Sequence, residues 1–196
     1  MTNRDKKDSI RGRMADAGEP FNVACRKVEA VAAGPVSEAE FQEIKRTGRC
    51  DLWNRELTVL PAEIGQLTSL RRLALGGNQL TALPAEIGQL SNLETLRLEG
   101  NQLTVLPAEI GQLTRLKGLA PAHNQLTVLP PEIGQLTRLR RLALDGNRLT
   151  ALPRELADLL SGGLELGLAG NPLQAPILEL YSQGPQALAS YLRGLE

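Results

Sequence analysis

The chain has 196 residues, and its 22 lysines and arginines balance 22 aspartates and glutamates, so its formal net charge is zero. No overall field therefore draws it to nucleic acid or to acidic lipid. Aromatic residues make up 3% of the chain, so leucine, with isoleucine and valine, must build the core.

The N-terminal sequence is charged and lacks the apolar centre of a secretory signal. No run of about 18 apolar residues occurs, so we expect no membrane-spanning segment. Cys25 and Cys50 lie outside any CxxC spacing, and two cysteines are too few for the disulfide sets of secreted domains. We expect a cytoplasmic protein that does not bind membranes.

Residues 1–36 are predicted to form a helical or partly disordered arm. Two short stretches, 8–17 and 21–32, carry apolar residues at helical spacing, and glycine and proline follow each of them. Such a helix pair either enters a DNA groove or packs on the next domain or on nothing. Its seven basic and five acidic residues give a net charge of +2, a weak footprint for DNA, so nucleic acid is not the expected partner.

Residues 37–48 are predicted to form an N-terminal cap helix. Ser37-Glu38-Ala39-Glu40 is a capping box, in which the Ser37 hydroxyl accepts the N–H of Glu40 and the Glu40 carboxylate accepts the N–H of Ser37. Thr47-Gly48 ends the helix directly before the first strand unit. A helix at this place covers the exposed end of the core, which an open repeat array requires.

Residues 49–172 are predicted to form a solenoid, because five near-copies of one 23-residue unit fill Leu57 to Asn171. An internal period in the twenties is typical of that architecture. The period is marked by a proline in every copy: Pro61, Pro84, Pro107, Pro130 and Pro153.

Each unit contains a strand and a return limb, so the predicted fold class is α/β. In Leu70-x-x-Leu73-x-Leu75, alternation with period two predicts a short strand with Leu73 and Leu75 facing inward. In Leu60-Pro61-x-Glu63-Ile64, proline sets a turn and the spacing fits a helical or 3₁₀ limb. An asparagine three residues after each strand is predicted to pair with the turning backbone. This structural ladder consists of Asn78, Asn101, Asn124, Asn147 and Asn171.

The unit LxxLPxEIGxLxxLxxLxLxxNx resembles the 23-residue intracellular leucine-rich repeat of Ras-group scaffold proteins, Roco GTPases and bacterial stand-alone arrays. The resemblance covers roughly 47–196 and implies a leucine-rich repeat solenoid, with parallel strands on a concave face that binds other proteins. The tail resembles the closing segment of such arrays, and residues 173–196 are a predicted C-terminal cap with an amphipathic helix at 185–195. No GxxxxGK[ST] motif occurs, so the GTPase activity of Roco relatives is not expected.

Alternation through six strand units leaves three outward columns of side chains on the strand face. Small residues in the middle column form a low-walled trough between unlike charges, which suits an extended segment or a helix of a partner protein. An error of one residue in register would turn all of these side chains inward. The predicted partner-binding residues are Arg49, Asp51, Trp53, Arg72, Thr95, Arg97, Glu99, Arg141, Asp145 and Glu165.

Two features of this face leave alternatives open. Trp53, the single tryptophan, is either an interface anchor or packs against the N-terminal cap. Pro121 replaces an inward leucine and His123 replaces a glycine, which predicts a local defect in the sheet. That defect is either a kink that a partner reads, with His123 as a pH-sensitive contact, or tolerated decay of a redundant array.

The sequence predicts no catalytic residue, no metal site and no cofactor. A lone histidine without a partnered serine or cysteine argues against a hydrolytic triad. The repeated glutamates lie one repeat apart on the return limbs, so they form no acid–base pair. We expect a monomeric protein–protein interaction scaffold in signal transduction. The alternative is a DNA-associated factor in which 1–36 contact DNA and the repeats recruit a protein.

Overall fold

The computed structural model describes residue 44 and residues 46–195. The predicted arm at 1–36 and most of the predicted cap helix at 37–48 lie outside these residues. The end of that helix is described, and its Gly48 N–H donates to the Ile44 carbonyl over 2.8 Å. Gly48 has a φ of +65°, a left-handed conformation that favours glycine, so the helix ends directly before the first strand.

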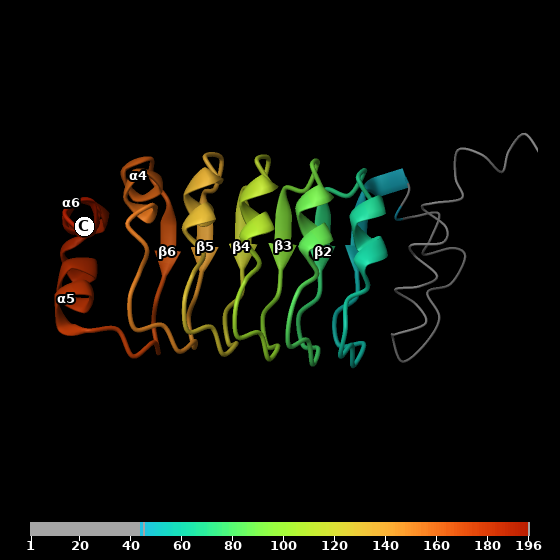
Figure 1. The fold of residues 1–196 in the computed structure, drawn as a ribbon, viewed down its shortest axis with the longest axis horizontal. Coiled ribbons are helices and arrows are strands. Elements are labelled where there is room, and N and C mark those ends of the chain that lie inside the picture. The colour runs from blue at the N-terminus through green and yellow to red at the C-terminus, as the bar shows by residue number, and fades with distance from the viewer. Residues whose placement is uncertain (1–43, 45, 196) are drawn as a thin grey trace, which may run out of the picture.

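The described chain winds into a row of similar coils, with one strand and one helical limb in each coil (Figure 1). The strands form one parallel sheet in chain order, as predicted for an α/β solenoid. They are β1 (Arg49–Asp51), β2 (Arg72–Ala74), β3 (Thr95–Arg97), β4 (Gly118–Ala120), β5 (Arg141–Ala143) and β6 (Glu165–Gly167). The limbs are the 3₁₀ helices η1 (Ala62–Gln66), η2 (Ala85–Gln89), η3 (Ala108–Gln112) and η4 (Pro131–Gln135), followed by the α-helix α4 (Leu156–Ser161).

Leucine and isoleucine side chains fill the space between the sheet and the limbs. In one coil, Leu73 lies in β2 and Leu75 follows its last residue, while Leu80 lies in the loop before η2 and Ile87 in η2 itself. All four side chains are fully buried. Fully burying one such side chain stabilises the fold by about 1.5–3 kcal/mol. A single coil encloses few of these residues, so stacking on neighbouring coils is what keeps the leucines from water.

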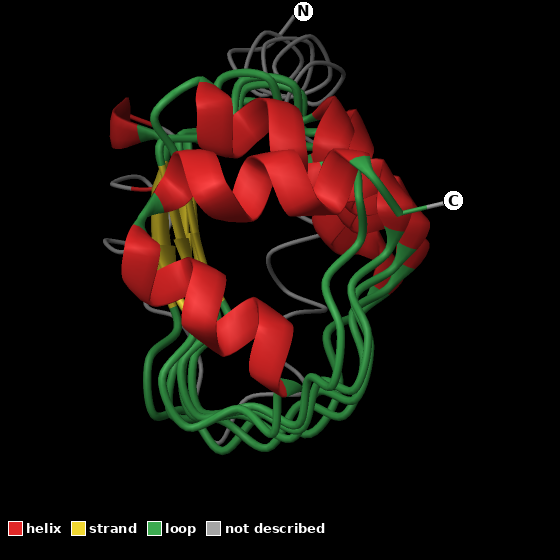
Figure 2. Cartoon of the chain, turned by 90° about the vertical axis from the view of Figure 1, so that its left-hand side faces the viewer, coloured by secondary structure: helices red, strands yellow, loops and turns green. Residues whose placement is uncertain are grey.

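The strands and the limbs occupy opposite sides of the molecule, which Figure 2 shows in a view from the C-terminal end. Proline precedes each 3₁₀ limb, where Pro61 and its equivalents adopt extended backbone with ψ near 150° in the first three limbs. Proline fixes φ and lacks an N–H, so it directs the chain into the limb without losing a helical hydrogen bond. Among the described residues, the limbs therefore leave the strand face uncovered.

Two helices close the C-terminal end, α5 (Ala175–Gln183) and α6 (Pro185–Arg193). Helix α6 lies in the segment where the amphipathic pattern predicts it, with Leu188 and Leu192 fully buried. Helix α5 also lies within the predicted cap at 173–196, ahead of its predicted amphipathic helix, and its Pro176 stands in the first turn, where proline is tolerated. The Tyr181 hydroxyl of α5 donates to the Leu166 carbonyl over 2.6 Å, which satisfies a backbone acceptor on the last strand.

The predicted defect at Pro121 is small. Three residue pairs join β3 to β4, but only two join β4 to β5. At the same place in other coils, Leu75 and Leu144 donate their N–H to the next strand at 2.8 and 2.9 Å, and Pro121 has no N–H to donate. The sheet still continues across β4, since this change removes one hydrogen bond and leaves the strand order intact.

His123 is in the left-handed region, with a φ of +54°, where the equivalent residues of neighbouring coils are glycines such as Gly100 and Gly146. A side chain in this conformation is strained by about 1 kcal/mol. We therefore expect His123→Gly to raise the free energy of unfolding by about 1 kcal/mol in chemical denaturation. Gly100→His, which places the same side chain in the preceding coil, should lower it by a similar amount. A lower stability for His123→Gly would show that the imidazole contributes more by packing than its backbone costs.

Candidate functional site

The strand face places the predicted side chains in aligned rows. The strand register places Arg49, Arg72, Thr95, Gly118, Arg141 and Glu165 in one row. The second row runs from Asp51 through Ala74 and Arg97 to Ala120, and Ala143 pairs with Gly167 further along. Seven of the ten predicted partner-binding residues are exposed, and Thr95, Glu99 and Asp145 are half-buried. Two outward alanines, Ala74 and Ala122, are buried because a methyl group does not reach past its larger neighbours.

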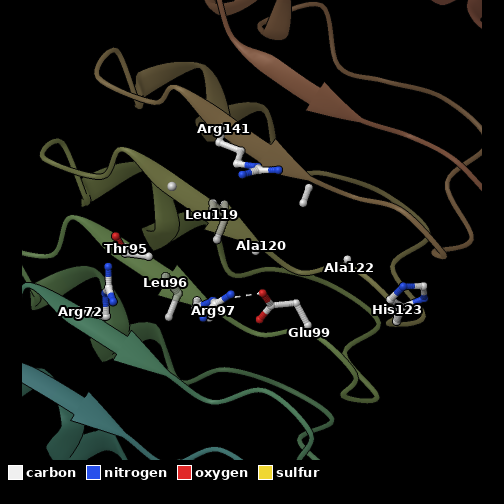
Figure 3. A pocket seen from close by; sticks show the side chains of 12 residues that line it. Arg72, Thr95, Leu96, Arg97, Glu99, Leu119, Ala120, Ala122, His123 and Arg141 are labelled. Atoms are coloured by element: carbon white, nitrogen blue, oxygen red, sulfur yellow. Dashed lines mark hydrogen bonds and ion pairs between the residues drawn. The ribbon is translucent and has the colours of Figure 1, made fainter.

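A hollow of about 570 Å³ lies at the centre of this face, across β2 to β5 (Figure 3). We call it the central hollow. Three arginines from three strands, Arg72, Arg97 and Arg141, line it together with Glu99. Strand β4 contributes Gly118 and Ala120, whose minimal side chains leave the middle open. An added Cβ at Gly118 would meet no atom closer than Thr95 Cγ2 at 3.8 Å.

The remaining predicted residues lie outside the central hollow. Arg49, Asp51 and Trp53 belong to β1 and the turn after it. Asp145 and Glu165 line a smaller hollow of about 170 Å³ together with Arg141. Asp145 Oδ1 accepts the Ala169 N–H over 3.0 Å, so this carboxylate is partly used in holding the next turn. The structure thus brings together five predicted residues: Arg72, Thr95, Arg97, Glu99 and Arg141.

Glu99 has the least satisfied carboxylate of this face. Its Oε1 accepts from Arg97 Nε over 3.3 Å. Its Oε2 is buried and has no hydrogen-bond partner, the single such side-chain atom found among the described residues. A buried acceptor without a partner costs free energy that a donor from a bound molecule would recover.

Trp53 lies across the turn of the second coil. An added Cβ at Gly76 would overlap its six-membered ring, so the indole covers this glycine. The Arg97 guanidinium stands 5.6 Å from the ring centroid, within the range of a cation–π contact. The described contacts of Trp53 are therefore with the turn after β2 and with Arg97 of β3. Packing against the predicted cap helix would involve residues 37–43, which lie outside the described residues. The indole remains 38% exposed.

Basic side chains continue beyond the starts of the strands. Lys117 Nζ lies 2.7 Å from Glu94 Oε2 and holds the pKa of that carboxyl below its usual value, with smaller contributions in the same direction from Arg71 and Arg115. Arg140 donates to the Gly162 carbonyl over 3.1 Å. This edge therefore carries an excess of positive charge, whereas Glu99 and Asp145 lie at the opposite ends of the strands.

The recurrent asparagines bridge consecutive coils. Asn78 Nδ2 donates to the Leu52 and Leu75 carbonyls over 2.8 and 2.7 Å, and its Oδ1 accepts the Leu57 N–H over 3.0 Å. Four of these asparagines are buried, and Asn171 in the last coil is half-buried. The ladder fixes the turn that follows each strand, so it positions Glu99 and Asp145, which lie two residues before Asn101 and Asn147.

No group of three or more His, Cys, Asp or Glu side chains arranged to hold a metal ion occurs in the part of the chain that the structure describes. Within the same residues, no helix has the length and apolarity needed to cross a bilayer.

Comparison with known families identifies the repeat family to which this chain belongs. A family described as leucine-rich repeat region matches residues 50–161, which is more than half of the chain. The chain belongs to the leucine-rich repeat family. No curated protein sequence matches closely enough to count as a relative.

Solved leucine-rich repeat structures are similar to this chain over part of their length. A leucine-rich repeat protein of Leptospira interrogans is 42% identical, with a TM-score of 0.68, over 76% of this chain and 38% of that one. The plant peptide hormone receptor RGFR1, solved in complex with RGF2, is 38% identical, with a TM-score of 0.58, over 64% and 21%.

A third similar structure is the leucine-rich repeat ectodomain of the Arabidopsis thaliana membrane receptor kinase GASSHO1/SCHENGEN3, in complex with CASPARIAN STRIP INTEGRITY FACTOR 2. It is 36% identical, with a TM-score of 0.60, over 67% of this chain and 16% of that one. The chain spans less than two-fifths of the length of each of these three proteins.

The central hollow of this leucine-rich repeat chain also includes His123. The sequence names His123 as a pH-sensitive contact in one of the two alternatives for the Pro121 defect, but not among the ten predicted partner-binding residues. The available signal was that His123 replaces a glycine next to an outward row. The openness above Gly118 was also missed, because it depends on what the side chains of neighbouring strands leave uncovered.

Proposed function

We propose that this protein is a protein–protein interaction scaffold that binds a partner protein on its strand face. The observation that carries the proposal is the central hollow, an open depression in a face that no described helix covers. The leucine-rich repeat fold typically mediates protein–protein interaction, and two of the similar solved structures hold a receptor in complex with RGF2 or with CASPARIAN STRIP INTEGRITY FACTOR 2.

The charges in the hollow support binding rather than a purely structural role. Arg72 forms no side-chain hydrogen bond or ion pair with any described residue. Arg141 Nε lies 4.0 Å from Glu165 Oε2, and the side chains of this pair are about three-quarters exposed. An exposed pair of this kind contributes little to stability. Charges that do little for the fold remain available to steer and select a partner.

The same proposal includes the repeat class, the location and the cellular role of the protein. The 23-residue period supports the intracellular Ras-group or Roco-type class, a cytoplasmic location and a role in signal transduction. We further propose a monomer without catalytic activity, cofactor or nucleic-acid ligand. The DNA-associated alternative depends on residues 1–36, outside the described part of the chain, and no observation in the described part favours it.

A crosslinking pull-down from native lysate tests the strand face. We expect Arg72→Glu/Arg141→Glu to lose a protein that the unmodified chain captures, because two charges that line the hollow are reversed. The matched control is Arg148→Glu/Arg154→Glu, which reverses two exposed arginines away from the strands. Far-UV circular dichroism verifies that both variants fold. Equal capture by the two variants would contradict binding on this face.

A further inference from the structure

The central hollow carries an excess of positive charge, which indicates what kind of segment fits it. Its three arginines outnumber its single carboxylate, and all three come from different strands. Figure 3 shows Arg72 and Arg141 on opposite sides of the hollow, with the Arg97–Glu99 pair between them and toward the strand ends. The occupant therefore needs negative charge at two separated points.

The separation of those points follows from the register. Arg72 pairs with Thr95, Thr95 with Gly118, and Gly118 with Arg141, so the two arginines lie three strands apart. At about 4.8 Å for each spacing between strands, their backbones are about 14 Å apart. An extended chain rises about 3.4 Å per residue, so side chains four residues apart are also about 14 Å apart and point to the same side.

We infer that the central hollow takes an extended acidic segment of the partner protein, lying across the strands, with carboxylates four residues apart on Arg72 and Arg141. Small residues on β4 make room for the segment between these two contacts. A hydrogen-bond donor of the segment reaches the Glu99 carboxylate, which lines the hollow and whose Oε2 has no partner within the described chain. This inference rests on the proposed function and specifies its ligand.

Glu99 also favours a peptide over other polyanions. A peptide backbone presents an N–H at every residue, so it can carry negative side chains and still donate to this carboxylate. A phosphodiester chain brings a charge with each nucleotide and would place more negative charge beside Glu99.

A helix rises 1.5 Å per residue, so a helical segment would need about nine residues to span the same two arginines.

Titration of the uniformly ¹⁵N-labelled full chain, followed by two-dimensional NMR, tests the inference. The probe is the synthetic nonapeptide Ser-Gly-Glu-Ser-Thr-Ser-Glu-Gly-Ser with blocked ends. Its controls are Ser-Gly-Ser-Glu-Glu-Ser-Thr-Gly-Ser, which has the same composition with adjacent acids, and a peptide with glutamine in place of both acids. We expect the probe to shift the Gly118 and Ala120 amide signals. It should bind about tenfold more tightly than the adjacent-acid control, which loses one charge-assisted contact, and about a hundredfold more tightly than the glutamine control, which loses both.

The protein variants assign the contacts. Arg72→Gln and Arg141→Gln should each weaken probe binding about tenfold, whereas Arg148→Gln, away from the strands, should leave it unchanged. Glu99→Ala should weaken it as well, because an acceptor for the peptide is lost. Tighter binding by Glu99→Ala would overturn the inference, since it would mean that Glu99 acts on the segment only by repulsion.

Three further outcomes also overturn the inference: equal affinity for the three peptides, no amide shifts on β4, or displacement of the probe by a single-stranded DNA oligonucleotide. None of these outcomes changes the expected capture of a partner protein in the pull-down. Loss of partner capture by Arg72→Glu/Arg141→Glu together with no probe binding would leave the strand face as the binding surface and reject the acidic segment. Probe binding without any effect of those reversals on partner capture would contradict the proposed function instead.

Discussion

Replacing Asn101 with alanine is expected to lower the free energy of unfolding by about 3 kcal/mol, through the loss of its bonds to the backbone of two coils. Its Nδ2 donates to the Leu75 and Leu98 carbonyls over 2.9 Å each, and its Oδ1 accepts the Leu80 N–H over 3.1 Å. The side chain is 7% exposed, so water does not readily replace these partners. Chemical denaturation followed by far-UV circular dichroism measures the loss.

The neighbouring residue provides the control for this prediction. Gln102 carries the same kind of amide one position further, but its side chain is exposed. Gln102→Ala should change the free energy of unfolding by less than about 0.5 kcal/mol, as is usual for surface positions. Equal effects of Asn101→Ala and Gln102→Ala would show that the asparagine ladder does not hold the coils together.

Adding one methyl group at Gly111 is expected to destabilise the protein by about 2 kcal/mol, because the limbs are too closely stacked to accept it. A Cβ at this position would lie 2.6 Å from the Glu132 carbonyl oxygen and 2.9 Å from Glu132 Cβ on the next limb. The carbonyl belongs to the backbone of η4, so relief requires the two limbs to move apart. The midpoint of denaturant unfolding of Gly111→Ala measures the cost.

Gly118→Ala is the matched control, since it makes the same substitution on the strand side of the solenoid. Its new methyl group would have Thr95 Cγ2 as its nearest neighbour, at 3.8 Å, an ordinary contact distance. The backbone there is not left-handed, so we expect Gly118→Ala to be neutral or slightly stabilising. A loss of stability as large as that of Gly111→Ala would contradict the difference in packing between the two sides.

The inward positions and the order of the strands could be predicted because each depends on a local pattern. Leu73 and Leu75 face the core through alternation with period two, and the same pattern recurs in each coil. The period of 23 residues brings equivalent residues side by side, so the row from Arg49 to Glu165 follows from counting along the chain. Helices α5 and α6 lie after the last repeat, so the period predicts neither of them, and α6 is predicted from its own amphipathic pattern.

The sequence by itself determined the leucine-rich repeat solenoid, its parallel strand face and the residues that line it, because repetition converts spacing along the chain into proximity in space. Tertiary structure alone decided which of these residues share a hollow, since this depends on side-chain volumes across several strands. Gly118 and Ala120 open the hollow, the Trp53 indole covers Gly76 instead of entering it, and Glu99 Oε2 is left buried without a partner. Packing and burial of this kind come from contacts between coils, which no single repeat contains.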